Sequence, residues 1–256
     1  MHSAPQPIET PLPPAVDCPI ITQPRKSERL GMVLGVNLGG EEVALSVSRE
    51  TRMPRASVVV TTAARSIIRI SKAQEKVESI AVHGSFTDAT LHPDFREITS
   101  NLRDLRNKWF PKAKLWLVSQ DPVLDVAEVR RCLGIYDRVL IRWEWGTAKT
   151  FAALTGRKSA EFTPLADYIA GLDHLVLQAR FYRGEIDNTT DAEVKAWVKK
   201  VGEFKPREVH ILNPDSKPTN KKLKAAPKAR VTEIAAELTE KTGIPATVYA
   251  SEALWS

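Results

Sequence analysis

The chain has 256 residues, enough for one α/β domain with a substantial hydrophobic core. Its apolar content of 43% and charged content of 27% are those of ordinary soluble proteins, and no apolar run approaches the roughly 18 residues that span a bilayer, so we expect no membrane association. A net charge of +6 suits a weakly bound anionic partner such as RNA, although a basic protein without such a partner explains it better.

The N-terminal residues 1–26 are rich in proline and polar residues and lack the charged and apolar regions of a signal peptide. We interpret them as an extended arm that packs on the domain, and we assign residues 27–256, which show no break in composition, to one domain. The two cysteines, Cys18 and Cys132, match neither a disulfide framework nor a metal-ligand spacing. We therefore expect a reducing compartment, the cytoplasm.

The first predicted elements follow this arm. A short apolar run at residues 32–36 predicts a strand, which leads into a loop that contains Gly39 and Gly40. Residues 55–60 are predicted to be extended, and Thr61 or Thr62 is predicted to cap a helix that ends near residue 73.

From residue 79 onward, short apolar strands alternate with amphipathic helices. Strands are predicted at residues 79–82, 114–118, 138–143, 174–181 and 208–212, with a short terminal strand at 247–249. Helices are predicted at about residues 93–108, 125–133, 148–154, 164–171, 190–201 and 228–242. The alternation predicts a parallel sheet with helical crossovers, but periodicity alone does not choose between a six-stranded partial barrel and a doubly wound sheet.

Six stretches together carry a resemblance to a known family. They are SERLGMVLGVNL (27–38), SIAVHGSFTDATLHPDF (79–95), RVLIRWEWGTAKTF (138–151), RFYRGEIDNTTDAEV (180–194), EVHILNPDSKP (208–218) and KTGIPATVY (241–249). In this order and spacing the chain resembles radical S-adenosylmethionine (radical SAM) proteins, in the branch of the wyosine-synthase-like iron–sulfur oxidoreductases. The resemblance implies a partial TIM barrel of about six β/α units with parallel strands.

The chain departs from that family at the loop after the first strand, where relatives carry C-x-x-x-C-x-x-C. Ala44, Ser48 and Thr51 stand at the three cysteine positions. Alanine offers no ligand, and hydroxyl groups are poor ligands for iron–sulfur iron. Cys132 is predicted on a helix on the wrong side of the barrel, and Cys18 lies in the arm. We expect no cluster and no cofactor, and the sequence leaves open whether S-adenosylmethionine still binds.

Polar side chains follow the second predicted strand, at the barrel mouth where such folds bind ligands. They are His83, Ser85, Asp88, Thr90 and His92. They could bind an anion or transfer protons. The alternative, that the two histidines satisfy backbone groups of the loops, is the one we favour.

A second set of polar residues follows the fourth predicted strand. Alternation along the strand places Arg142 and Glu144 on one face, opposite Trp143 and Trp145, and Arg180 on the next strand can join them. They form either an internal ion pair or a site for a carboxylate or phosphate. Asn213, at the end of the sixth predicted strand, also falls at the mouth.

The densest basic segment lies near the C-terminus. It comprises Lys217, Lys221, Lys222, Lys224, Lys228 and Arg230. It could contact RNA phosphates, but it contains no interleaved aromatic residues for base stacking, and a solvated linker is the favoured interpretation.

Three functions follow from these observations. The first is a degenerate radical-SAM-like barrel without a cluster, a non-catalytic binding or regulatory partner of an active radical SAM paralogue or of another protein. The second is an enzyme with cluster-free chemistry at the barrel mouth, with His83, Asp88, His92, Arg142 and Glu144 as its acid, base and anion-binding groups. The third is an RNA-associated protein, because the family's nearest members act on tRNA.

Overall fold

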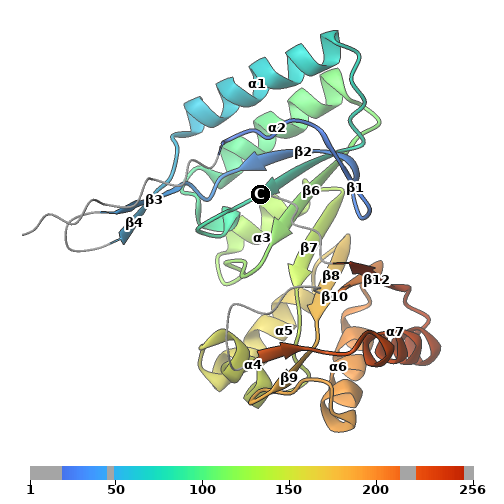
Figure 1. The fold of residues 1–256 in the computed structure, drawn as a ribbon. Coiled ribbons are helices and arrows are strands. Elements are labelled where there is room, and N and C mark those ends of the chain that lie inside the picture. The colour runs from blue at the N-terminus through green and yellow to red at the C-terminus, as the bar shows by residue number, and fades with distance from the viewer. Residues whose placement is uncertain (1–18, 45–48, 214–222, 251–256) are drawn as a thin grey trace, which may run out of the picture.

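The computed structural model describes residues 19–44, 49–213 and 223–250, and for residues 41–44, 49–52 and 213 the backbone alone. An eight-stranded sheet forms its centre (Figure 1). In spatial order the strands are β1 (Arg25–Ser27), β2 (Gly31–Asn37), β5 (Ser79–His83), β6 (Lys114–Ser119), β7 (Arg138–Arg142), β8 (Leu175–Arg180), β10 (Glu208–Asn213) and β12 (Ala246–Ala250). The short edge strand β1 runs antiparallel to β2, and the other neighbours pair in parallel.

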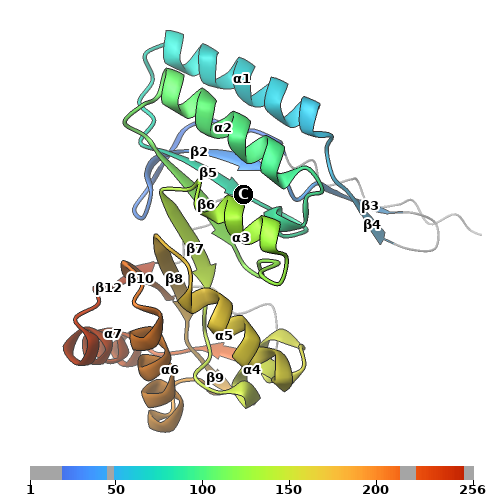
Figure 2. The same ribbon diagram turned by 180° about the vertical axis from the view of Figure 1, so that it is seen from behind.

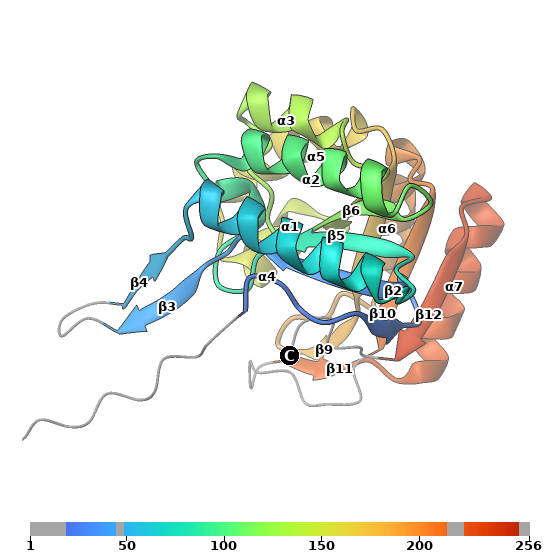
Figure 3. The ribbon, with the colours of Figure 1, turned by 90° about the horizontal axis from the view of Figure 1, so that it is seen from above.

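Helices connect the parallel strands. The structure describes α1 (Ala56–Lys72), α2 (Phe95–Trp109), α3 (Ala127–Leu133), α4 (Ala148–Thr155), α5 (Phe162–Ala170), α6 (Asp191–Phe204) and α7 (Lys228–Thr242), with the 3-10 turns η1 (Ala89–Leu91) and η2 (Ser159–Glu161). The helices α1 and α2 lie side by side against the strands (Figures 2 and 3). Of the helices described, none has the length and apolar character needed to cross a bilayer.

The helices pack on one face of the sheet. Buried residues from all seven described helices share one core cluster with the outward side chains of the strands, for example Leu34, Leu117 and Leu177. In the described part of the chain, the opposite face carries a separate small cluster that includes Val33 and Trp116 and no helical residue. Because a doubly wound sheet would have helices on both faces and a reversal of strand order, the arrangement confirms the partial TIM barrel.

Side chains fill the concave face below the mouth. Arg29, in the turn between β1 and β2, donates from Nη1 to Oε1 of Gln178 on β8 over 2.7 Å. The rings of Trp116 and His210 lie 6.4 Å apart between centroids on the same face. The first strand of the sheet is therefore tied to the far half of the barrel through its interior.

The first helix begins earlier than predicted, and the prediction of an extended segment at residues 55–60 is wrong. Ala56, Val59, Ala63 and Ile67 are buried at helical spacing in α1, which starts directly after the extended Arg55. Burial of this apolar stripe outweighs the preference of three consecutive valines for a strand.

The loop predicted after the first strand contains a hairpin instead. Strands β3 (Glu41–Ala44) and β4 (Arg49–Arg52) pair antiparallel, with Glu42 opposite Thr51 and Ala44 opposite Arg49. The hairpin projects away from the sheet and its helices (Figures 1 and 3).

Two further elements differ from the prediction. The strands β9 (Tyr182–Gly184) and β11 (Leu223–Ala225) form a small antiparallel sheet that periodicity does not reveal in such short segments. Helix α6 continues past Gly202, because the buried Phe204 extends its apolar stripe, and it ends at Lys205 with φ 51°. Thr190 caps α6 and Gly243 caps α7, which agrees with the predicted start near residue 190 and the predicted end near residue 242.

Backbones meet closely where the connections after β2 and β5 touch. A Cβ atom placed on Gly84 would lie 1.8 Å from the carbonyl oxygen of Thr87, and one on Gly39 would lie 2.4 Å from the same oxygen. Because this oxygen is a main-chain atom, it cannot move aside without displacing the loop.

We expect Gly39→Ala to lower the free energy of unfolding by about 1–3 kcal/mol through overpacking against the backbone of Ser85 and Thr87 in the other loop. The matched control is Gly134→Ala, where the nearest heavy atom would lie 3.5 Å from the new Cβ, and we expect a change below about 1 kcal/mol. Urea denaturation of both variants measures the difference. Equal stabilities would contradict the close contact between the two loops.

Candidate ligand site at the barrel mouth

Buried side-chain acceptors join the loops around the barrel mouth. Oδ1 of Asn37, at the end of β2, accepts from the backbone N–H groups of Gly39 (3.0 Å) and Ser85 (3.1 Å). The hydroxyl of Thr87 in turn donates to the carbonyl of Gly39 over 3.1 Å. The loops after β2 and β5 are therefore held together by hydrogen bonds, and Ser85 contributes its backbone while its side chain is exposed.

Asp88 joins the β5 loop to the β6 loop. Its Oδ2 accepts from the hydroxyl of Ser119 (2.6 Å) and from the backbone N–H groups of Gln120 (3.0 Å) and Asp121 (3.2 Å). Its Oδ1 accepts from the backbone (3.0 Å) and the hydroxyl (2.7 Å) of Thr90. With five donors around it, this carboxylate organises the rim and has little capacity left for a ligand.

His92 also binds the backbone. Its Nδ1 accepts from the N–H of Asp94 (3.1 Å), so its Nε2 carries the proton and donates to the carbonyl of Pro54 (2.7 Å). Thr90 likewise accepts from the backbone N–H of Val123 over 3.0 Å. Both residues also line a cavity of about 270 Å³ with side chains of α2 and α3, on the helix-covered side of the sheet.

His83 ends strand β5 and is buried, with 2% of its surface exposed. Burial, together with the positive charge of Arg25, lowers its pKa to about 3. The imidazole is therefore neutral at physiological pH.

The second predicted set does come together, at the carboxyl ends of β7 and β8. Arg142 lies opposite Gln178 in the register of β7 and β8, and the N–H of Trp143 donates to the carbonyl of Gln178 over 2.8 Å. Beyond the end of β7, the carbonyls of Glu144 and Arg180 both accept from the side-chain amide of Asn188, which places these two residues side by side. Trp143 and Trp145 point the other way, into the core beneath the helices.

Tyr182 and Asn188 complete this group. Tyr182 follows Arg180 by two residues, with the buried Phe181 between them packed against Trp197 on α6. Asn188 accepts from the N–H of Tyr182 (2.6 Å) and donates to the carbonyls of Glu144 (2.7 Å) and Arg180 (2.9 Å). This side chain therefore fixes the backbone that carries the three polar residues.

The electrostatics of the group follow from its burial. Burial raises the pKa of Glu144 above its usual range, and the positive charges of Arg142 and Arg180 offset part of that rise. Burial, with the nearby Glu144, raises the pKa of Tyr182 to about 12, so its hydroxyl keeps its proton. The guanidinium of Arg142 is held near the ring of Trp145, with 5.7 Å from Cζ to the ring centroid.

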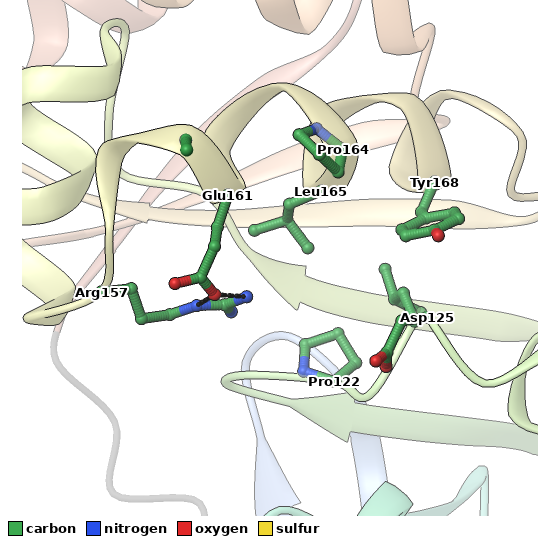
Figure 4. Close-up of a pocket in the computed structure, with 9 residues that line it drawn as sticks. Pro122, Asp125, Arg157, Glu161, Pro164, Leu165 and Tyr168 are labelled. Carbon is green, nitrogen blue, oxygen red and sulfur yellow. Dashed lines mark hydrogen bonds and ion pairs between the residues drawn. The ribbon is translucent and has the colours of Figure 1, made fainter.

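A separate cavity of about 320 Å³ opens between the β6 loop and α5 (Figure 4). Pro122 and Asp125 form one wall and Leu165 and Tyr168 the other. Arg157 closes one end, where it binds Glu161 over 2.9 Å and Asp121, outside the cavity lining, over 2.6 Å. Its charge is thus satisfied within the protein.

The residues present do not fit an iron–sulfur cluster. Ala44 and Thr51 occupy opposite strands of the β3–β4 hairpin, while Ser48 lies outside the described residues. Cys132 lies on α3 as predicted, buried in the outer core, where burial raises the pKa of its thiol. Within the described ranges, no group of three or more His, Cys, Asp or Glu side chains could hold a metal ion.

The remaining predicted residues are placed elsewhere or only in part. Asn213 ends β10 opposite Ala250, and only its backbone is described by the structure. Of the basic segment, Lys217, Lys221 and Lys222 also lie outside the described residues, and Lys224 on β11 and Lys228 on α7 are exposed. Arg230 binds the carbonyl of Thr189 (2.9 Å) and the carboxylate of Asp191 (2.7 Å), so it serves the fold.

Neither Tyr182 nor Asn37 stands out as a site residue in the sequence. The signal for Tyr182 is its spacing of two from Arg180, which places both on one face. Asn37 is a polar residue at the end of an otherwise apolar strand, which is unusual enough to mark a structural or functional role.

No family model and no curated protein matches this sequence. A solved domain of pyruvate-formate lyase-activating enzyme from Bacteroides vulgatus is similar, with a TM-score of 0.50 and 13% identity over 66% of this chain and 97% of that domain. A radical SAM methyltransferase from Sphaerobacter thermophilus is similar with a TM-score of 0.54 and 13% identity, over 86% of this chain and 67% of that protein. At this identity the likeness shows the fold, a partial barrel of the radical SAM type.

The burial of His83 predicts a loss of stability in acid. Its pKa is lowered on folding, so the unfolded chain binds the extra proton first, and the free energy of unfolding falls as the pH drops from about 6.5 toward 3. We expect His83→Gln to reduce this slope by up to about 1.4 kcal/mol per pH unit. Urea denaturation at several pH values in that window measures it, and an unchanged slope would contradict a neutral buried His83.

Proposed function

We propose that this chain is a radical-SAM-type barrel without an iron–sulfur cluster, which acts as a non-catalytic binding or regulatory partner instead of by radical chemistry. The small number of cysteines in the sequence is the main support for this proposal. The chain contains two cysteines, whereas the resemblance implies three at the loop after the first strand. Alanine, serine and threonine stand at those three positions.

The placement of Cys132 supports the proposal. Its thiol is buried beneath α3 among apolar side chains, and its raised pKa disfavours the thiolate that iron requires. Because Cys132 is part of the outer core, Cys18 is the one other cysteine of the sequence that could reach the mouth. One thiolate does not hold a cluster.

The positions and hydrogen bonds of the polar residues at the mouth favour a binding role over acid–base catalysis. Asp88 and His92 make hydrogen bonds that hold loops together, as described above, and His92 faces the helix-covered side. Arg142 and Glu144 belong to a different cluster, on the concave side. The five groups required for cluster-free chemistry are therefore divided between two places. We infer that the mouth binds a ligand or a partner. We also infer that this ligand is not S-adenosylmethionine, because relatives anchor that molecule through cluster iron.

The test is anaerobic reconstitution with ferrous iron and sulfide, followed by desalting and measurement of iron, sulfide and visible absorbance. We expect no cluster absorbance and no stoichiometric iron. A cluster would bring about four irons per chain together with a broad visible band. That result would refute the proposal.

Cys132→Ser serves as the matched control in this experiment. Because the thiol lies in the outer core, its removal is expected to leave the trace of adventitious iron unchanged. Iron that disappears in this variant would show that the buried cysteine reaches a metal, which contradicts its commitment to the outer core.

A further inference from the structure

Two buried polar atoms at the mouth have no hydrogen-bond partner among the described residues. They are Nε of Arg142 and Oε1 of Glu144. Glu144 has 4% of its surface exposed, so water does not compensate it freely. Because buried polar groups in folded proteins are nearly always hydrogen-bonded, two such atoms in one cluster indicate a bound group that supplies the partners.

The surrounding residues place further donors at the same point. Asn188 donates to the carbonyls of both Glu144 and Arg180, which places the two residues beside each other, and Tyr182 interacts with the charges of both. Asn188 holds the backbone carbonyls of Glu144 and Arg180 at 2.7 and 2.9 Å. The donors are thus preorganised by hydrogen bonds that do not involve their own side chains.

We propose that Arg142, Arg180, Tyr182 and the carboxyl group of Glu144 bind the oxyanion head of a small ligand, a carboxylate or a phosphate. The inference rests on the proposed function, since it requires a mouth that is free for binding, and it specifies the chemical class of the ligand.

The balance of charge selects an anion over a cation. Two guanidinium groups face one carboxyl group, and the tyrosine hydroxyl adds a further donor. Guanidinium groups bind carboxylate and phosphate oxygens in matched geometry, often with two parallel hydrogen bonds. A cationic ligand would have to approach both arginines without compensation.

Binding is expected to depend on pH through Glu144. Among the described residues, the charged and titratable groups that act on it are Arg142, Arg180 and Tyr182. A bound anion favours the protonated carboxyl group, which donates to it, over the carboxylate, which repels it. Affinity therefore falls as the pH rises through the pKa of Glu144.

The experiment titrates the full chain with sulfate and, separately, with acetate at constant ionic strength. Sulfate represents the tetrahedral phosphate head without titrating near neutral pH, and acetate represents the carboxylate. Calorimetry measures affinity, and ¹⁵N NMR of arginine Nε–H groups reports directly on Arg142. We expect saturable binding of at least one of the two anions, with a shift of the Arg142 Nε–H signal.

Arg142→Gln and Arg180→Gln are each expected to weaken the binding about tenfold or more, the effect of one charge-assisted hydrogen bond. Glu144→Gln keeps a donor of the same shape, so it is expected to bind with an affinity that no longer depends on pH. The matched control is Arg96→Gln on α2, whose side chain is 73% exposed on the helix-covered side of the sheet, and its affinity is expected to equal that of the natural chain.

The assignment would be overturned if neither sulfate nor acetate binds. It would also be overturned if Arg142→Gln, Arg180→Gln and Arg96→Gln bind the anion with equal affinity. This failure is distinct from a failure of the proposed function, because the iron measurement is made on the natural chain without any anion.

Discussion

Asn37, Asp88 and Asn188 each use one short side chain to join backbone groups that lie far apart in the sequence. Asn37 connects the ends of β2 and β5, Asp88 connects the loops after β5 and β6, and Asn188 connects the ends of β7 and β8. Parallel strands leave their carboxyl ends at one edge of the sheet, where the chain turns away and its backbone groups lack ladder partners. These three side chains supply the missing partners, and the geometry of the mouth depends on them.

These hydrogen bonds explain how the loops of the mouth keep their positions without a cluster. The loops are held by internal hydrogen bonds, and the close contact between Gly39 and Gly84 locks the first two together. The interior below is filled, with Arg29 bonded to Gln178 and Trp116 near His210. Among the described residues of the mouth, the polar group on β7 and β8 keeps unsatisfied atoms, and this is where the architecture leaves capacity for a ligand.

Much of the fold could be predicted from the sequence, because apolar runs such as residues 79–82 and caps such as Thr190 report local structure directly. The start of α1 could not, since Val58, Val59 and Val60 favour a strand locally, whereas burial of Val59 together with Ala56 and Ala63 makes the segment helical. At the mouth, alternation correctly placed Arg142 and Glu144 together. His92 binds loop backbone groups, in agreement with the favoured interpretation of the sequence. The role of Asp88 could not be predicted, because its partner Gln120 is more than thirty residues away.

The anion site depends most directly on the protonation state of Glu144, which decides whether the cluster presents donors to an anion or an internal salt bridge. An infrared difference spectrum between the natural chain and Glu144→Gln at neutral pH reads this state. We predict that the natural chain shows the carbonyl stretch of a buried protonated carboxyl group and that the variant lacks it. A difference spectrum containing the bands of an ionised carboxylate instead would show that Glu144 is paired with Arg142 or Arg180, and would contradict the anion site.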